Sequence, residues 1–199
     1  MNVGILTLDG FNELDSLIAY SMINRLESSG LKAHIIGTTA SATSMNGLTI
    51  KTEKRPDYLS ECEAVIIGSG SKTLSHLDNE ILLNQIKLND EKQLISSQCS
   101  GALILQTLGF LENQSISTDQ FTRSTLETRG YTTNEHSFSY KKKIATSGGC
   151  LASTYLATWI TDSLLGREAT VEMLEKVLPV DDTKNRIAEI FEKIAITAE

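Results

Sequence analysis

The chain has 199 residues, with 18 lysines and arginines against 25 aspartates and glutamates and a formal net charge of -7. This length suits one domain with a substantial core, and 40 % hydrophobic with 22 % charged residues is typical of a globular protein. The acidic balance disfavours attraction to nucleic-acid phosphates, so we expect no nucleic-acid partner. The lysines at residues 141–143 are interpreted as solvated strand charges.

The first residues enter an apolar segment without the basic region or cleavage site of a signal peptide. No apolar run reaches the ~20 residues of a membrane span. Cys62, Cys99 and Cys150 lack the paired spacing of a disulfide framework or a zinc site. We therefore expect a cytoplasmic protein with at least one free thiol, no membrane contact, no metal and no organic cofactor.

Apolar runs of strand length occur at residues 3–8, 32–37, 64–67 and 93–97. Helical spacing follows the first run until Gly30, and further helices are expected at residues 81–86 and 102–111. Strands at 137–142 and 144–147 precede helices at 151–165 and 169–177. This alternation predicts an α/β fold with a mostly parallel central sheet covered by helices on both faces.

Pro179 and the pair Asp181 and Asp182 are expected to break the chain before a last helix at residues 183–196. The predicted organisation is therefore an α/β domain over residues 1–180, followed by a C-terminal helix within residues 181–199. That helix is expected to pack on the domain or on a dimer partner.

Residues 94–105 combine an apolar strand, a tight turn of small residues and an apolar helix, with Cys99 at the junction. This pattern is typical of a nucleophile elbow, where the residue after the nucleophile lends its N–H to an oxyanion hole. The start of a helix also favours a lowered thiol pKa through the helix dipole. The alternative is a buried core thiol, because free cysteine is among the most buried residue types.

A resemblance to the ThiJ/PfpI superfamily is carried by residues 3–6 with 11–15, and by residues 64–70, 97–101 and 146–149. It extends to about Val177 and is strongest for the isonitrile hydratase-like branch. It implies a flavodoxin-like three-layer sandwich of the class I glutamine-amidotransferase type, with a nucleophile elbow at a strand-to-helix turn. It also suggests a homodimer.

The resemblance matches Cys99 to the superfamily's elbow cysteine and Asp15 to its acidic partner, which hydrogen-bonds the thiolate or shuttles a proton. It matches the turn containing Ser69 and Gly70 to a glycine-rich loop, whose N–H groups with that of Ser100 would form the oxyanion hole. From the residues alone, a carboxylate at a helix N-terminus is the better interpretation of Asp15, and the alternative for the loop is a plain turn.

Other polar residues are candidates for the pocket around the cysteine. Glu13 is a competing carboxylate beside Asp15, and His76 follows the glycine-rich loop and could reach the pocket mouth. Asp119 lies after the nucleophile helix. Cys150 follows two glycines and could approach the site as a resolving thiol.

Three positions depart from the superfamily's patterns. Ser100 stands where protease-like members carry histidine directly after the cysteine, so we expect no peptidase activity. Ser16 follows Asp15 where the isonitrile hydratase branch continues with Thr-Gly-Pro. Asp119 lies in the segment where that branch carries Thr-His-Trp. The substrate pocket is therefore expected to differ, while the elbow is retained.

The sequence thus predicts a cysteine-nucleophile enzyme, a hydratase or amidase-like hydrolase, acting on a small carbon–nitrogen or carbonyl electrophile. An alternative is a redox- or stress-responsive protein that senses oxidants through Cys99 without turnover. A third is a ligand-sensing module, without the helix-turn-helix segment of a direct DNA regulator. The expected partners are a small-molecule substrate or oxidant and a second copy of the chain.

Overall fold

A computed structural model describes residues 1–197 of the chain. Its main strands are β1 Asn2–Leu6, β2 Lys32–Ile36, β5 Ala64–Ile67, β6 Leu94–Gln98, β7 Phe138–Lys141 and β8 Ile144–Ser147. They form a six-stranded sheet in the order β2-β1-β5-β6-β8-β7. Neighbouring strands pair in parallel except β7 and β8, which are antiparallel. The predicted mostly parallel sheet is confirmed.

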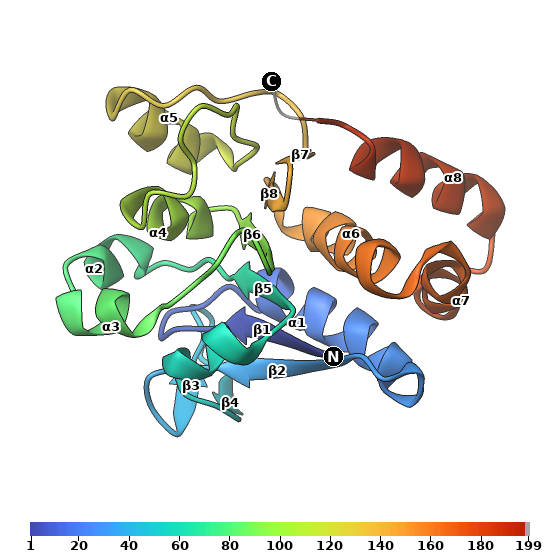
Figure 1. The fold of residues 1–199 in the computed structure, drawn as a ribbon, viewed down its shortest axis with the longest axis horizontal. Helices are drawn as coiled ribbons and strands as arrows, with labels where there is room; N and C mark the ends of the chain where they lie inside the picture. The colour runs from blue at the N-terminus through green and yellow to red at the C-terminus, as the bar shows by residue number, and fades with distance from the viewer. Residues whose placement is uncertain (198–199) are drawn as a thin grey trace.

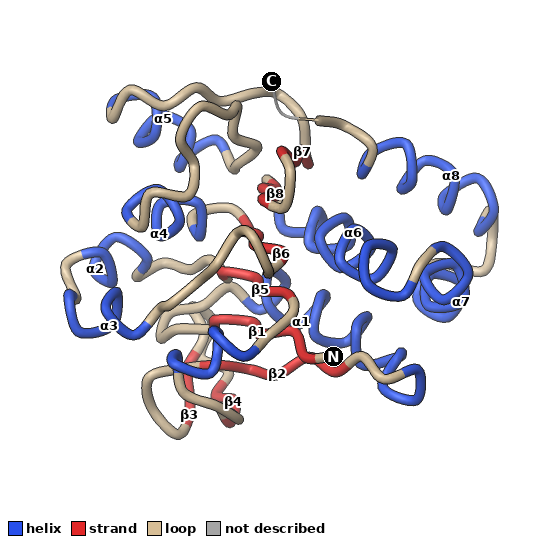
Figure 2. Tube along the Cα trace, viewed as in Figure 1, coloured by secondary structure: helices blue, strands red, loops and turns tan. Residues whose placement is uncertain are grey.

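Helices cover both faces of this sheet, as Figure 1 and the tube in Figure 2 show. One layer holds α1 Glu13–Ile23, α6 Ser153–Leu165, α7 Arg167–Val177 and α8 Thr183–Ile194. The other holds α2 Thr73–Leu77, α3 Glu80–Gln85, α4 Gly101–Thr107 and α5 Gln120–Thr128. The result is the expected three-layer α/β sandwich.

The two apolar cores follow from the alternation of side chains along each strand. In β5, Ala64 and Ile66 belong to the core under α1 and α6, whereas Val65 and Ile67 belong to the core under α4. All four side chains are fully buried. Burial on both faces explains why the strands read as continuous apolar runs in the sequence.

Several elements differ from the sequence-based expectations. The first helix ends at Ile23 and continues as a 3₁₀ helix, Asn24–Ser29, before Gly30 adopts a left-handed φ of 85°. The small hairpin of β3 Ser41–Thr43 and β4 Thr49–Lys51 was not predicted, and neither were α2 and α5. These elements are short or polar, so their apolar periodicity is weak.

The C-terminal helix α8 packs against α6 and the edge strand β7. Its Ile190 and Ile194 are buried in the core on that side of the sheet. Residues 198–199, the end of the predicted C-terminal segment, lie outside the described residues. Within residues 1–197, no helix combines the length and the apolar character needed to cross a membrane.

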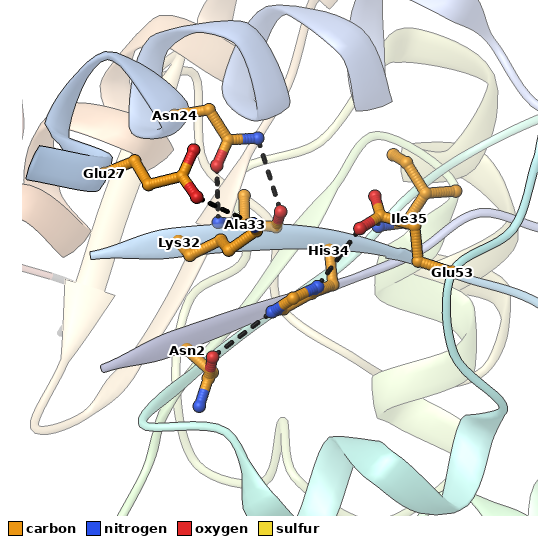
Figure 3. A network of polar contacts seen from close by, with 8 residues as sticks. All are labelled: Asn2, Asn24, Glu27, Lys32, Ala33, His34, Ile35 and Glu53. Carbon is orange, nitrogen blue, oxygen red and sulfur yellow. Dashed lines mark hydrogen bonds and ion pairs between the residues drawn. The ribbon is translucent and has the colours of Figure 1, made fainter. Parts of the chain in front are cut away.

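The outer edge of β2 is closed by side chains, as Figure 3 shows. The backbone N–H of Ala33 donates to Asn24 Oδ1 at 2.9 Å, and Asn24 Nδ2 donates to the Ala33 carbonyl at 3.3 Å. Glu53 accepts from the Ile35 N–H at 3.2 Å and contacts the His34 ring at the same distance. These contacts satisfy the backbone groups that an edge strand leaves unpaired.

We predict that Asn24→Ala lowers the free energy of unfolding by about 1–3 kcal/mol, because both edge groups of buried Ala33 lose their partner. The measurement is urea denaturation followed by circular dichroism. Lys32 lies on the same strand as Ala33, and Lys32→Ala, which removes only its exposed ion pair with Glu27, should leave the midpoint unchanged. Equal stability of Asn24→Ala and the parent would contradict this account of the edge.

Candidate functional site

The carboxyl ends of β1, β5, β6 and β8 bring four loops together at one edge of the sheet. Asp15 follows β1 in the first turn of α1, Ser69 follows β5, Cys99 follows β6, and Cys150 follows β8. In the sheet β2 lies on one side of β1, and β5, which follows β2 along the chain, lies on the other side of β1. Reversals of this kind open a crevice where α/β proteins bind ligands.

Cys99 sits on a strained turn between β6 and α4. Its φ is 45°, a left-handed value that is uncommon outside glycine. Its N–H donates to the Ser147 carbonyl at 2.8 Å, and its carbonyl accepts from Thr118 Oγ1 at 3.0 Å. The expected nucleophile elbow is confirmed, and hydrogen bonds hold the backbone on both sides of the thiol.

Gly101 explains why the turn needs a small residue after the cysteine. A Cβ at this position would lie 2.3 Å from the carbonyl oxygen of Ile67 on β5. The start of α4 therefore packs directly on the neighbouring strand. Any larger residue at position 101 would push the elbow away from the sheet.

Asp15 is fully buried beside the cysteine. The Ser69 hydroxyl donates to its Oδ2, while its Oδ1 has no hydrogen-bond partner among the described residues. One carboxylate oxygen of Asp15 and the Sγ atoms of Cys99 and Cys150 all lie within 4.8 Å of one another. A carboxylate with a free oxygen thus faces two thiols.

The electrostatics of this cluster correct the expected lowering of the thiol pKa. Burial and the carboxylates of Asp15 and Asp119 raise the pKa of Cys99 above its ordinary value. Burial is the largest of these causes. Burial also raises the pKa of Asp15, against the hydrogen bond from Ser69.

Both pKa values move upward, so the surroundings favour the protonated form of each group. Cys99 therefore rests as a thiol rather than a thiolate at neutral pH. A thiol in this state reacts when the carboxylate accepts its proton during attack. The arrangement is suited to general-base activation.

Cys150 lies partly exposed at the same cavity. Asn12 Nδ2 donates to its Sγ at 3.1 Å, and Gln98 Nε2 donates to the Gly149 carbonyl at 2.8 Å, which fixes the turn before it. Burial is the main cause of the raised pKa of Cys150. The structure therefore brings a second thiol to the elbow cysteine.

The three residues expected at an oxyanion hole lie close together, with different partners. The Gly70 N–H donates to Ser100 Oγ at 3.3 Å, so it is already engaged. Ser100 Oγ also shares a hydrogen bond of 2.8 Å with Thr73 Oγ1. Ser69 contributes its hydroxyl to Asp15.

Asp119 lines the cavity and caps helix α5, where its Oδ1 accepts from the N–H groups of Phe121 and Thr122 at 3.0 Å. The structure does not bring Glu13 and His76 into this cavity. Glu13 instead accepts from Ser44, which lowers the pKa of Glu13, and His76 Nε2 contacts the Asp9 carbonyl at 2.9 Å.

Sequence reasoning missed Asn12, Gln98 and Thr118, which orient the cysteines through the contacts described above. Asn12 carried a usable signal, because asparagine directly before a predicted helix is a typical N-cap, and it caps α1. Thr118 carried none, since its contact with Cys99 depends on how the loop after α4 returns to the sheet.

Asp15, Cys99 and Cys150 also form a set of atoms that thiophilic metal ions accept. Three protein ligands are one fewer than a closed structural zinc site uses. The expectation that the protein needs no metal stays a prediction.

These residues line a cavity of about 530 Å³ that opens at the carboxyl edge of the sheet. Asp15, Cys99 and Cys150 lie in it with Ser69, Gly70 and Ser100. A volume of this size suits a small molecule.

Comparison with solved structures supports the same architecture. The structure of Schizosaccharomyces pombe DJ-1 superposes with a TM-score of 0.77 at 15 % identity, covering 90 % of this chain and 100 % of that one. A ThiJ/PfpI family protein from Pseudomonas syringae gives 0.77 at 19 %, covering 98 % and 87 %. Oxidized Toxoplasma gondii DJ-1 gives 0.73 at 18 %, covering 88 % and 97 %. At these identities the likeness establishes the fold.

Comparison with curated proteins gave no match. The DJ-1/PfpI family model, in contrast, matches residues 1–162, which include both catalytic candidates, Asp15 and Cys99. The chain therefore belongs to the DJ-1/PfpI family.

Proposed function

We propose that the protein is a cysteine-dependent enzyme, a hydratase or amidase-like hydrolase, acting on a small carbon–nitrogen or carbonyl electrophile. The observation that carries this proposal is the buried Asp15 carboxylate beside the thiol of an elbow cysteine. One of its oxygens lies within 4.8 Å of Cys99 Sγ, and its Oδ1 has no hydrogen-bond partner among the described residues. A buried acceptor without a donor is costly for stability, and such groups concentrate at functional sites.

In the proposed reaction, Asp15 accepts the thiol proton while Cys99 Sγ attacks the electrophilic carbon. A carbon–sulfur bond forms, and Asp15 returns the proton to the substrate. With an amide, the electron pair moves to the oxygen, where the N–H of Ser100 stabilises the developing charge. The carbon–nitrogen bond then breaks, the protonated amine leaves, and water hydrolyses the thioester to a carboxylic acid and the free thiol. With an isonitrile, the proton goes to the terminal carbon and gives a thioimidate, which water hydrolyses to an N-substituted formamide and the free thiol.

Within the family, we propose chemistry like that of the isonitrile hydratase branch. The elbow around Cys99 and the position of Asp15 support it. Peptidase activity is disfavoured, because Ser100 occupies the position after the cysteine and hydrogen-bonds Thr73 and Gly70. The homodimer and the cytoplasmic location remain predictions.

A second candidate function, oxidant sensing, is supported by the proximity of Cys150. Cys99 Sγ would attack a hydroperoxide, forming a sulfenic acid and releasing an alcohol or water. The Cys150 thiol would then displace water from that sulfur and close a disulfide. Among the relatives, the Toxoplasma gondii DJ-1 structure is of an oxidized protein.

We predict that Cys99→Ser abolishes turnover in a panel of small isonitriles, amides and dicarbonyls, and that Asp15→Asn lowers kcat by about 10²–10⁴-fold. Product formation is the readout. Cys62→Ala, which removes a buried cysteine that does not line the cavity, is the matched control and should retain activity. Turnover that survives Cys99→Ser would refute the proposal. Loss of both thiols to peroxide without any turnover would favour the sensor.

The pH profile of alkylation tests the role of Asp15 separately. Cys99 should react with iodoacetamide with a midpoint above the ~8.5 of free cysteine, because burial and two carboxylates raise its pKa. In Asp15→Asn the midpoint should fall, since one negative charge is removed, although catalysis is lost. Buried Cys62, with a pKa raised to about 12, is the internal reference. A midpoint that rises in Asp15→Asn would instead make Asp15 a donor to the thiolate.

A further inference from the structure

The charge of the cavity is one-sided. Asp15 and Asp119 both line it, and they act together to raise the pKa of Cys99. Across residues 1–197, the lining contains no lysine, arginine or histidine. An anionic substrate at Cys99 would therefore meet two carboxylates and no cation.

Two cationic side chains that neighbour lining residues in the sequence have partners elsewhere. Lys72, beside the glycine-rich loop, pairs with Asp9 at 3.7 Å. Arg123 on α5 pairs with Glu135 and donates to the Asn134 carbonyl at 2.8 Å. Neither side chain belongs to the cavity lining. The negative charges of Asp15 and Asp119 in the cavity are therefore not offset by these two side chains.

The mouth of the same cavity is apolar. Phe121 is 88 % exposed, Leu74 57 % and Met45 50 %, and all line the cavity. They come from α5, α2 and the loop between β3 and β4, so distant segments supply one apolar rim. Exposed apolar side chains gathered around a cavity are typical of a surface that a ligand covers.

We propose that this cavity selects uncharged electrophiles bearing an apolar group, with Asp119 rejecting anionic substrates and Phe121 binding the apolar group. The inference rests on the proposed function, because it places the reacting carbon at Cys99. It names a substrate class that excludes carboxylates and phosphates.

One substitution at Asp119 can remove its charge without removing its structural role as a helix cap. Its Oδ1 caps α5 by accepting two backbone N–H groups. Asparagine caps helices as well as aspartate does. Asp119→Asn therefore removes the charge and keeps the helix start.

The charge test compares iodoacetamide with iodoacetate, two alkylating reagents of the same chemistry that differ by one negative charge. The rate at Cys99, located by peptide mass spectrometry, is measured in the folded chain and in urea. Folding should raise the amide-to-acid rate ratio by about tenfold or more, since like charges in a cavity repel strongly. In Asp119→Asn a large part of this increase in the amide-to-acid rate ratio should be lost, because iodoacetate then meets one negative charge fewer. Glu91→Gln, an equal charge change at an exposed site before β6, should leave the increase unchanged.

The apolar test compares N-benzyl iodoacetamide with iodoacetamide on the folded chain. The benzyl reagent should react faster at Cys99. Phe121→Ala should reduce that preference about tenfold, because the benzyl group then loses the free energy gained by burying apolar surface against the aromatic ring. Val180→Ala, which truncates a 98 % exposed apolar residue away from the cavity, is the control.

Equal amide-to-acid ratios in the folded and unfolded chain, or ratios insensitive to Asp119→Asn, would overturn the charge selectivity. A benzyl preference that is absent, or unaffected by Phe121→Ala, would overturn the role of the rim. Both tests read alkylation, so they stand if no turnover is found. Cys99-dependent turnover with no selectivity would remove this inference and leave the proposed function intact.

Discussion

The site depends on one interaction, a buried carboxylate held beside a buried thiol in a cavity that no lysine, arginine or histidine of residues 1–197 lines. Asp15 receives a hydrogen bond from Ser69 on Oδ2, and one of its oxygens lies within 4.8 Å of Cys99 Sγ. In a low-dielectric setting two negative charges side by side are strongly unfavourable, so the pair keeps at least one proton. The cysteine is therefore a nucleophile activated on demand rather than a permanent thiolate.

The fold supplies this pairing by topology. Asp15 and Cys99 are far apart in the sequence, yet each follows a strand whose carboxyl end reaches the same edge of the sheet. Between their strands lies β5, whose following loop carries Ser69. The close approach of Gly101 to Ile67 then sets the height of the elbow above the sheet.

The main strands and the elbow were predictable because their signals are local. Apolar runs marked the strands, and small residues around Cys99 marked the turn. The direction of the thiol pKa was not predictable, because it depends on the burial of Cys99 in the folded chain and on the carboxylates of Asp15 and Asp119, which come from other loops. Glu13 and His76 were indistinguishable from cavity residues in sequence, since their hydrogen bonds to Ser44 and to the Asp9 carbonyl are tertiary. The hairpin of β3 and β4 is too short for a periodic signal.

The cavity has a buried floor and an exposed mouth, and this difference determines which of its residues can change during evolution. The floor of the cavity, where Cys99 lies, is built on strand ends packed in both cores. Met45, Leu74 and Phe121 at its mouth are at least half exposed. Exposed positions tolerate substitution with little effect on stability. Substrate preference can therefore drift, by natural selection or in a focused mutant library, while the chemistry at the elbow is inherited unchanged.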